Sequence, residues 1–335
     1  MNKTLIALAV SVAALATGAN AANVYSSEGT ELNIGGRAEF RGDFIGSDGA
    51  EIDGTMANQS RFRLNVGGTT EITNNLSGFG FYEAEQGVGS SANDQVSDDT
   101  NTDFKQRYMF AGLKGDFGAI SFGRQDTAAV QISQMSDVTT FTGAQKEFIN
   151  AGNEQINNTI LYTGDFDALT VKASAILGED KDTNGYGISA IYNLPMGLGL
   201  GLGYSGGDNG EDNGSGDAII AGVNYTYESL YLAGTYTTGE VDDKDGSDFN
   251  GVELAAVYGF GNGFSIMGAY QKTDVKVNGS KEDQSDFFEI TGDYAFNKNM
   301  NAYLAYQLNN LDSEYVDGLK VQGEDTLRLG LKYSF

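Results

Sequence analysis

The last eleven residues of the chain, 325–335, contain a strict alternation of apolar and polar side chains. A period of two places successive side chains on opposite faces of a β-strand. Similar segments recur along the whole chain, and no helical stretch of consequence follows the N-terminus. The repetition predicts an all-β, transmembrane antiparallel β-barrel, apolar outside and polar inside, although a soluble sandwich could use the same alternation. The apolar positions are Leu327, Leu329, Leu331, Tyr333 and Phe335.

The first 21 residues have the features of an export signal. Lys3 supplies a positive start, residues 5–16 form an apolar stretch, and Ala19-Asn20-Ala21 is a small-x-small cleavage sequence. The apolar stretch is too short to cross a membrane as a helix, which takes roughly 20 residues. We therefore expect Sec-dependent export and cleavage after Ala21, which leaves residues 22–335 as one barrel domain.

The amino-acid composition argues against most other functional classes. The chain has no Cys and no His, so zinc sites, Ser-His-Asp triads and Cys-His pairs are not available to it. It carries no Walker A or EF-hand pattern, and the glycines of 197–203 alternate with leucine as in a strand rather than in a dinucleotide-binding loop. We expect no enzymatic activity, no cofactor and no dedicated metal site, although the acidic loops could hold divalent cations loosely. A formal net charge of −26 argues against nucleic acid as a partner.

The alternating segments number sixteen, five before and eleven after a long interruption at 125–154. A bacterial single-chain barrel needs an even number of strands. The expected strands are 30–44, 58–72, 76–85, 104–114, 119–124, 156–163, 168–178, 185–193, 198–206, 217–227, 229–240, 248–258, 263–274, 284–295, 300–312 and 322–335.

The connections between these segments alternate between short and long. Asn74-Asn75 and Asp116-Phe117 are typical of the short set, whereas 207–216 and 241–247 belong to a longer and mostly acidic set. Outer-membrane barrels have this asymmetry, with short periplasmic turns and long external loops. The segment 125–154 far exceeds the usual connection of about 4–6 residues. Its apolar residues indicate that it packs against something, as a surface lobe or as a loop folded into the lumen.

Five stretches carry a resemblance to a known family. They are NIGGRAEFRGDF at 33–44, SRFRLNVGG at 60–68, RYMFAGLKGDFGAISFGR at 107–124, FNKNMNAYLAYQLNNLDS at 296–313 and the terminal LRLGLKYSF. The chain resembles the trimeric general porins of the Gram-negative outer membrane, particularly the OmpU-like group. The resemblance implies sixteen strands, a homotrimer, and a third external loop, here 125–154, folded into the lumen.

The resemblance also implies a pore constriction in which basic residues of the wall face acidic residues of the loop. Arg37, Arg63 and Arg107 match basic wall positions, and Asp137 matches a loop acid. Arg37 and Arg63 fall on the polar faces of their strands, and Glu83 is a further candidate carboxylate of the lumen. The chain departs from the family at Gln155, where a wall arginine is common, and at 139–143, where Thr-Thr-Phe-Thr-Gly replaces Pro-Glu-Phe-Gly-Gly.

A lumen lined by polar side chains predicts passive diffusion of ions and small hydrophilic solutes, and acidic external loops predict a preference for cations. By resemblance, Tyr333 and Phe335 belong to the signal read by the barrel-insertion machinery. Outer-membrane lipid and lipopolysaccharide are the expected surroundings. The alternative from another class is a structural or adhesive barrel whose acidic loops bind host or envelope ligands. A sugar-specific channel would need an aromatic track, to which Phe79 and Phe81 could contribute.

Overall fold

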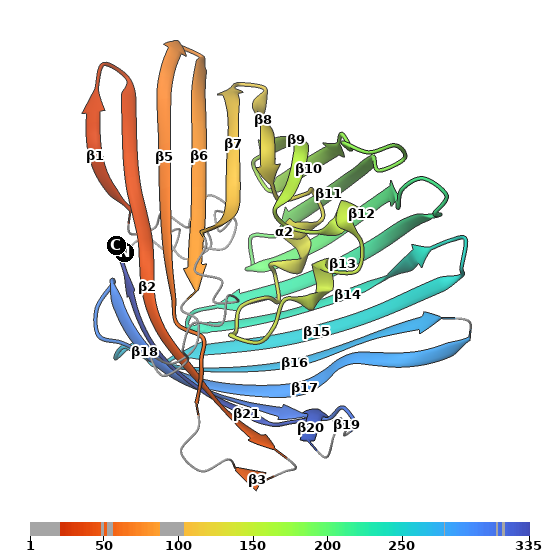
Figure 1. Ribbon diagram of the computed structural model, residues 1–335. Helices are drawn as coiled ribbons and strands as arrows, with labels where there is room; N and C mark the ends of the chain where they lie inside the picture. Colours follow the sequence, from red (N-terminus) through yellow and green to blue (C-terminus); the bar gives the residue numbers. More distant parts are fainter. Residues whose placement is uncertain are drawn as a thin grey trace.

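The computed structural model describes residues 21–47, 50–51, 56–87, 104–277, 279–312, 314–316 and 319–335. The architecture is a closed antiparallel barrel of 16 strands (Figure 1), which confirms the predicted fold class and strand number. The wall consists of β2 (Thr30–Ser47), β5 (Arg61–Thr73), β6 (Leu76–Gly87), β7 (Lys105–Gly115), β8 (Gly118–Gln125), β9 (Ile156–Phe166), β10 (Leu169–Ile176), β11 (Gly185–Asn193), β12 (Leu198–Asp208), β13 (Ser215–Tyr227), β14 (Leu230–Asp242), β15 (Ser247–Gly259), β16 (Phe264–Val277), β17 (Ser280–Ala295), β18 (Met300–Asn309) and β21 (Thr326–Ser334).

Short elements decorate this wall. They are the strands β1 (Ala22–Ser27), β3 (Ala50–Glu51), β4 (Ala57–Asn58), β19 (Glu314–Val316) and β20 (Leu319–Gln322), the helix α2 (Val130–Ser133), and the 3₁₀ turns η2 (Ala144–Lys146) and η3 (Asn150–Gly152). No helix in the described ranges is long and apolar enough to cross a membrane. Residues 1–20 of the expected export signal lie outside the described residues, so cleavage after Ala21 stays a prediction.

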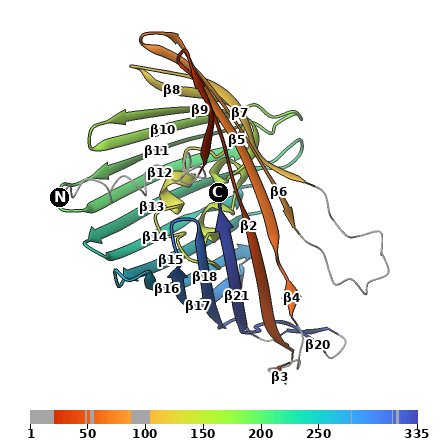
Figure 2. The ribbon, with the colours of Figure 1, turned by 90° about the vertical axis from the view of Figure 1, so that its left-hand side faces the viewer.

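The barrel closes where the first long strand meets the last. β2 pairs antiparallel with β21 from Arg37 opposite Ser334 to Ile45 opposite Thr326, and the two lie side by side in Figure 2. Gly36 and Phe335 exchange two backbone hydrogen bonds of 3.0 Å at the end of this ladder. β1 pairs with the part of β2 that β21 leaves open. Closure satisfies the backbone groups that an open sheet would leave exposed in hydrocarbon.

Side chains sort between the two faces as the alternation predicts. Along β18, Leu304 is 51% exposed on the outer face, whereas its neighbours Tyr303 and Ala305 are buried on the inner face. On β21, Leu329 and Leu331 are likewise exposed. Large apolar side chains on the outer face are suited to contact with lipid, because their exposure to water would be costly.

One predicted boundary is wrong in an informative way. The alternation predicts that one strand ends at residue 274 and that the next starts at 284, but β16 and β17 continue until only residues 278 and 279 separate them. The sequence there is Asn-Gly, which favours a two-residue hairpin turn, and Gly279 adopts the positive φ of 85° that such a turn requires. β-Pairing therefore extends beyond the alternating segments.

A charge on the lipid face should test the barrel orientation. We expect Leu304→Lys to reduce the free energy of folding into lipid vesicles by about 2–4 kcal/mol, because Leu304 lies in the middle of β18 and a lysine there would enter hydrocarbon. Guanidinium titration of vesicle-inserted protein measures this loss. Gln307→Lys, on the inner face of the same strand, is the matched control and should cost clearly less. Equal losses would contradict the assignment of faces.

Candidate functional site

A cluster of charged side chains covers the inner face of β2, β5, β6 and β7. We call it the arginine–glutamate cluster, and its members are Arg37, Arg41, Arg61, Arg63, Arg107, Glu39, Glu83 and Glu85. Strand register brings the members together, since Arg37 lies opposite Arg63 and Glu39 lies opposite Arg61. Five arginines against three glutamates leave a formal charge of +2.

Glu83 and Glu39 each bind more than one neighbouring group of this cluster. Glu83 is fully buried; it accepts a hydrogen bond of 2.9 Å from Arg107 Nε and lies 3.4 Å from Arg63 Nη1. Glu39 accepts bonds from Arg61 Nε at 2.7 Å and from the Tyr303 hydroxyl at 2.6 Å. Buried carboxylates of this kind need such charged partners, because an unpaired buried charge is very costly.

The segment 125–154 lies against the concave face of the sheet (Figure 1). Ile132 and Met135 pack in an apolar cluster with Ile220 of β13, and Phe148 stacks on Phe249 of β15 with ring centroids 4.1 Å apart. These contacts join the segment to β13 and β15. Its apolar residues therefore pack against the inner wall.

Glycines of the wall make room for this packing. A Cβ at Gly201 or at Gly222 would lie within 3.0 Å of both Ile132 and Met135, closer than real Cβ atoms approach. Both positions are on the inner face, while the leucines that alternate with Gly201 point outward, Leu200 and Leu202 being exposed. In the alternating stretch 197–203, the leucines thus point outward, and the absence of a side chain at Gly201 leaves space for the segment on the inner face.

Two glutamates of the wall bind residues 136–143, which we call the tip of the segment, mainly through backbone N–H groups. Glu289 of β17 accepts hydrogen bonds from Thr140 N at 3.0 Å, from Phe141 N at 3.1 Å and from the Thr139 hydroxyl at 2.6 Å. Glu253 of β15 accepts bonds from Gly143 N at 2.8 Å and from the Ser136 hydroxyl at 2.7 Å. We call Glu253 and Glu289 the carboxylate latch.

The tip also contacts the closing seam. Arg328 of β21 donates from two nitrogens to Asp43 of β2, both at 2.7 Å, and its Nη1 donates to the Thr140 carbonyl at 2.9 Å. The same guanidinium lies 4.0 Å from the centroid of the Phe141 ring. A cation over an aromatic face is attracted to it. The tip is therefore bound both to β15 and β17 and to the junction of β2 with β21.

The comparisons with known proteins assign this architecture. A family model described as Gram-negative porin matches residues 7–314. The chain belongs to the Gram-negative porin family. It is 36% identical to outer membrane protein U of Vibrio cholerae and 32% identical to porin-like protein L of Photobacterium profundum, in each case over 100% of both chains.

Solved structures agree in fold. The model matches Salmonella typhi OmpF in complex with daunomycin with a TM-score of 0.79 at 21% identity, over 94% of this chain and 100% of that one. It matches in-vitro folded OmpT of Vibrio cholerae in its trimer form with a TM-score of 0.71 at 16% identity, over 91% and 99%. The protein is an outer-membrane porin, and the family favours a channel over an enzyme or an adhesive scaffold.

In this porin, four of the five expected constriction residues lie in one place. Arg37, Arg63, Arg107 and Glu83 all belong to the arginine–glutamate cluster. Asp137 does not face that cluster in any contact of the described residues. It accepts a hydrogen bond of 2.7 Å from Lys146 of its own segment.

The Lys146–Asp137 pair is largely buried, and Glu154 lies 3.8 Å from the same ammonium. Burial favours the neutral amine, but the negative charges of Asp137 and Glu154 outweigh it and raise the pKa of Lys146 above its ordinary value. Lys146 is therefore a cation of the segment at neutral pH. The positive charge of Lys146 neutralises most of the negative charge of Asp137 within the segment.

Sequence reasoning missed several charged residues of this interior. They are Glu39, Glu85, Asp43, Arg328, Glu253 and Glu289. Strand parity places Glu39 on the polar face with Arg37 and Arg41, but it does not mark Glu39 as a member of the site. Parity could not have found the carboxylate latch, because it gives the face of a side chain but not the partner it meets.

The two departures from the family pattern also have a place in the structure. Gln155 adopts a positive φ of 57°, and its side chain donates to Glu154 at 2.9 Å rather than joining the cluster. The 139–143 stretch meets the carboxylate latch mainly through backbone N–H groups. Backbone donors are independent of side-chain identity, so these three contacts do not depend on which side chains occupy 140, 141 and 143.

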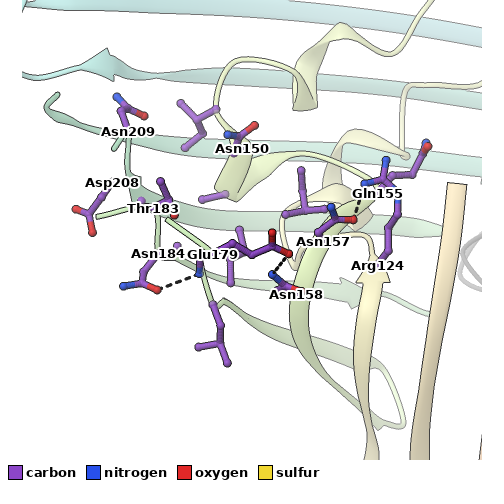
Figure 3. Close-up of a pocket in the computed structure, with 18 residues that line it drawn as sticks. Arg124, Asn150, Gln155, Asn157, Asn158, Glu179, Thr183, Asn184, Asp208 and Asn209 are labelled. Atoms are coloured by element: carbon purple, nitrogen blue, oxygen red, sulfur yellow. Dashed lines mark hydrogen bonds between the residues drawn. The ribbon is translucent and has the colours of Figure 1, made fainter. Parts of the chain in front are cut away.

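A separate cavity of about 390 Å³ opens beside the end of the segment (Figure 3). Its lining is rich in amides, and these are engaged with neighbouring groups: Arg124 donates to Asn157 at 2.8 Å, and Asn158 donates to Glu179 at 3.0 Å. It lies where the segment meets the connections after β10 and β12. The two hydrogen bonds join β8 to β9, and β9 to the connection after β10.

Removing one member of the carboxylate latch should loosen the segment. Glu289→Ala deletes the three hydrogen bonds that the segment donates to this carboxylate, each worth roughly 1.5–3 kcal/mol, so trypsin should cut after Lys146 at least tenfold faster. Mass spectrometry of fragments from folded protein in detergent measures the rate. Glu240→Ala, at an exposed position of β14, is the matched control. An unchanged cleavage rate in Glu289→Ala would contradict the latch.

Proposed function

We propose that the 125–154 segment narrows the channel of this porin, which passes ions and small hydrophilic solutes by passive diffusion and prefers cations. The observation that carries the proposal is the attachment of the segment to the inner face of β13, β15 and β17 by packing and by the carboxylate latch. A solute must then pass between the segment and the arginine–glutamate cluster on β2, β5, β6 and β7. Sixteen strands leave an aqueous interior wide enough for such a passage.

The two sides of this passage carry opposite charge. The arginine–glutamate cluster has a formal charge of +2. The segment contains four acids, Asp126, Asp137, Glu147 and Glu154, against the single cation Lys146, for a formal charge of −3. Opposed charges closer than the Debye length, about 8 Å at physiological salt, act across the passage with little screening. The resulting transverse field orients dipolar solutes and disfavours bulky apolar ones.

The cation preference follows from charge outside this passage. The connection after β12 carries Glu211 and Asp212, and the connection after β14 carries Asp243 and Asp245. With a net charge of −26 for the chain, the mouth of the channel raises the local concentration of cations. A further acidic connection, with Asp94, Asp98, Asp99 and Asp103, lies outside the described residues.

Tyr333 and Phe335 are proposed as part of the signal read by the insertion machinery. Phe335 is the last residue, and its ring stacks on Tyr333 and Phe62 with centroid separations of 6.0 and 6.3 Å. Its backbone bonds to Gly36 form only when the barrel closes. The backbone groups of Phe335 are therefore available to the insertion machinery before the barrel closes, and they are paired with Gly36 afterwards.

A homotrimer in outer-membrane lipid and lipopolysaccharide is proposed as the working assembly. Small residues on the outer face of the first strands, among them Ala38, Gly78 and Gly80, permit close approach of another wall. The trimer form of OmpT, which shares the fold, supports this proposal. Hydrocarbon would cover the remaining apolar outer surface.

Selectivity tests the proposed conduction. Reversal potentials of single channels under a KCl gradient should give a higher permeability for K⁺ than for Cl⁻. Lys146→Gln should increase this preference, and Asp137→Asn should shift it toward anions, because each breaks a pair whose charges cancel. The interaction energy of two unit charges 4 Å apart in water is about 1 kcal/mol, which is enough for a severalfold change in the permeability ratio.

The double variant Asp137→Asn/Lys146→Gln is the control, since it removes a neutral pair and should conduct like the parent. Anion preference in the parent protein would refute the inference about the mouth. Unchanged selectivity in both single variants would place Asp137 and Lys146 away from the passage.

Gel mobility tests the assembly. Without heating in SDS, we expect the purified porin to migrate as a trimer, and heating should yield the monomer. Gly80→Phe should abolish the unheated trimer, because a ring would stand out from a wall that must lie close to another. Leu254→Phe, on the outer face of β15, is the control. A parent protein that runs as a monomer in cross-linking as well as on the gel would contradict the proposal.

A further inference from the structure

Four aromatic rings form a continuous surface on the first strands of the wall. They belong to Phe79 and Phe81 of β6 and to Tyr108 and Phe110 of β7, and we call them the aromatic patch. Phe81 lies 5.6 Å from Phe110 and 6.2 Å from Tyr108, and Phe79 lies 6.4 Å from Phe110, all between ring centroids. Such separations are typical of interacting aromatic pairs.

The aromatic patch faces the lumen. Phe79 and Phe81 share the parity of Glu83 on β6, and Glu83 binds the arginines of the inner wall. A Cβ at Gly67 would lie 3.3 Å from the Phe81 ring, and one at Gly112 would lie 2.6 Å from Phe79. The rings therefore lie over glycine positions of the wall. They keep part of their surface exposed.

One ring of the patch is fixed in place and borders a positive charge. The Tyr108 hydroxyl donates to Asp126 at 2.9 Å, and the Arg107 guanidinium lies 5.8 Å from the Tyr108 ring centroid. Arg107 is paired with Glu83, but the two differ in access to the lumen. The Arg107 side chain is 20% exposed and that of Glu83 is 0% exposed. Of these two groups, a solute at the patch meets Arg107 and not Glu83, while Glu85 of the same cluster, which accepts a hydrogen bond from Arg63, is 19% exposed.

We propose that the aromatic patch and Arg107 form a weak binding subsite for small aryl carboxylates inside the channel. The aryl ring lies on Phe81 and Phe110, and the carboxylate points to the exposed side of Arg107. Arginine suits this role because its guanidinium offers several donors to a carboxylate. The inference rests on the proposed conducting channel, and it names a class of solute that the channel holds during passage.

An aryl cation would find a poorer site. Its ammonium group would approach Arg107 and also Arg63, which is 11% exposed at the same cluster. Small carboxylates without a ring would meet the charge but gain nothing from the patch. Ring and negative charge are therefore both required, and the two contributions can be separated by the choice of solute.

Single-channel recording with three probes tests the subsite. Phenylacetate, acetate and phenethylammonium are added in turn to the intact porin conducting KCl, and current blockade is measured. We expect phenylacetate to block at a concentration roughly fivefold lower than either other probe, as stacking worth about 1 kcal/mol implies. Phe81→Leu and Phe110→Leu keep an apolar side chain and remove a ring, so each should abolish most of this difference. Phe260→Leu, an exposed aromatic outside the patch, should leave it intact.

Calorimetric titration of phenylacetate into the detergent-solubilised porin gives a second readout that does not require conduction. A protein that binds phenylacetate but gives no open steps would defeat the proposed channel and leave the subsite standing. Open steps with equal blockade by acetate and phenylacetate would overturn the subsite. So would blockade that Phe81→Leu and Phe110→Leu both leave unchanged. Equal blockade by phenethylammonium would overturn the role of Arg107.

Discussion

The backbone ladder between β2 and β21 is the constraint on which the rest of the structure depends. In hydrocarbon each N–H and C=O group must find its partner within the protein, and a sheet of sixteen strands can satisfy them all only by closing. Closure joins segments at opposite ends of the chain, with Arg37 opposite Ser334 and Ile45 opposite Thr326. The same junction brings Asp43 to Arg328 on the inner face. Closing the barrel therefore also creates one of the attachments of the 125–154 segment.

The inner wall is adapted to that segment over several strands. Gly201 and Gly222 provide the space that Ile132 and Met135 occupy, and Phe249 provides a flat surface for Phe148. A barrel interior lined only by polar side chains would not bind an apolar helix. The wall is instead divided, with a recessed and partly apolar half under the segment and a charged half on β2, β5, β6 and β7. In the proposed channel, the passage lies between halves of different chemistry.

Sequence periodicity predicted the strands because the membrane imposes one apolar face on every strand, and that face is visible in local sequence. It also placed Arg37 and Arg63 on the inner face. It failed where the outcome depends on contacts between remote residues. Glu289 and Thr140 are 149 positions apart, and parity says nothing about which loop a wall carboxylate meets. Resemblance identified Asp137 as a loop acid, but the structure pairs it with Lys146, a local cation that neither periodicity nor the motif implicates.

The register of the charged half explains why its carboxylates are as necessary as its arginines. Arg37 and Arg63 lie directly opposite each other across β2 and β5, an arrangement of like charges that destabilises a sheet. Glu85 lies opposite Arg63 on the other side and accepts its hydrogen bond at 2.6 Å, and it is 3.6 Å from Arg37. One carboxylate therefore screens the repulsion between two arginines. Removing Glu85 or Glu39 would raise the positive charge of the wall, but the guanidinium groups would lose the hydrogen bonds that fix their positions. The cluster therefore keeps a charge of +2 together with ordered arginine side chains.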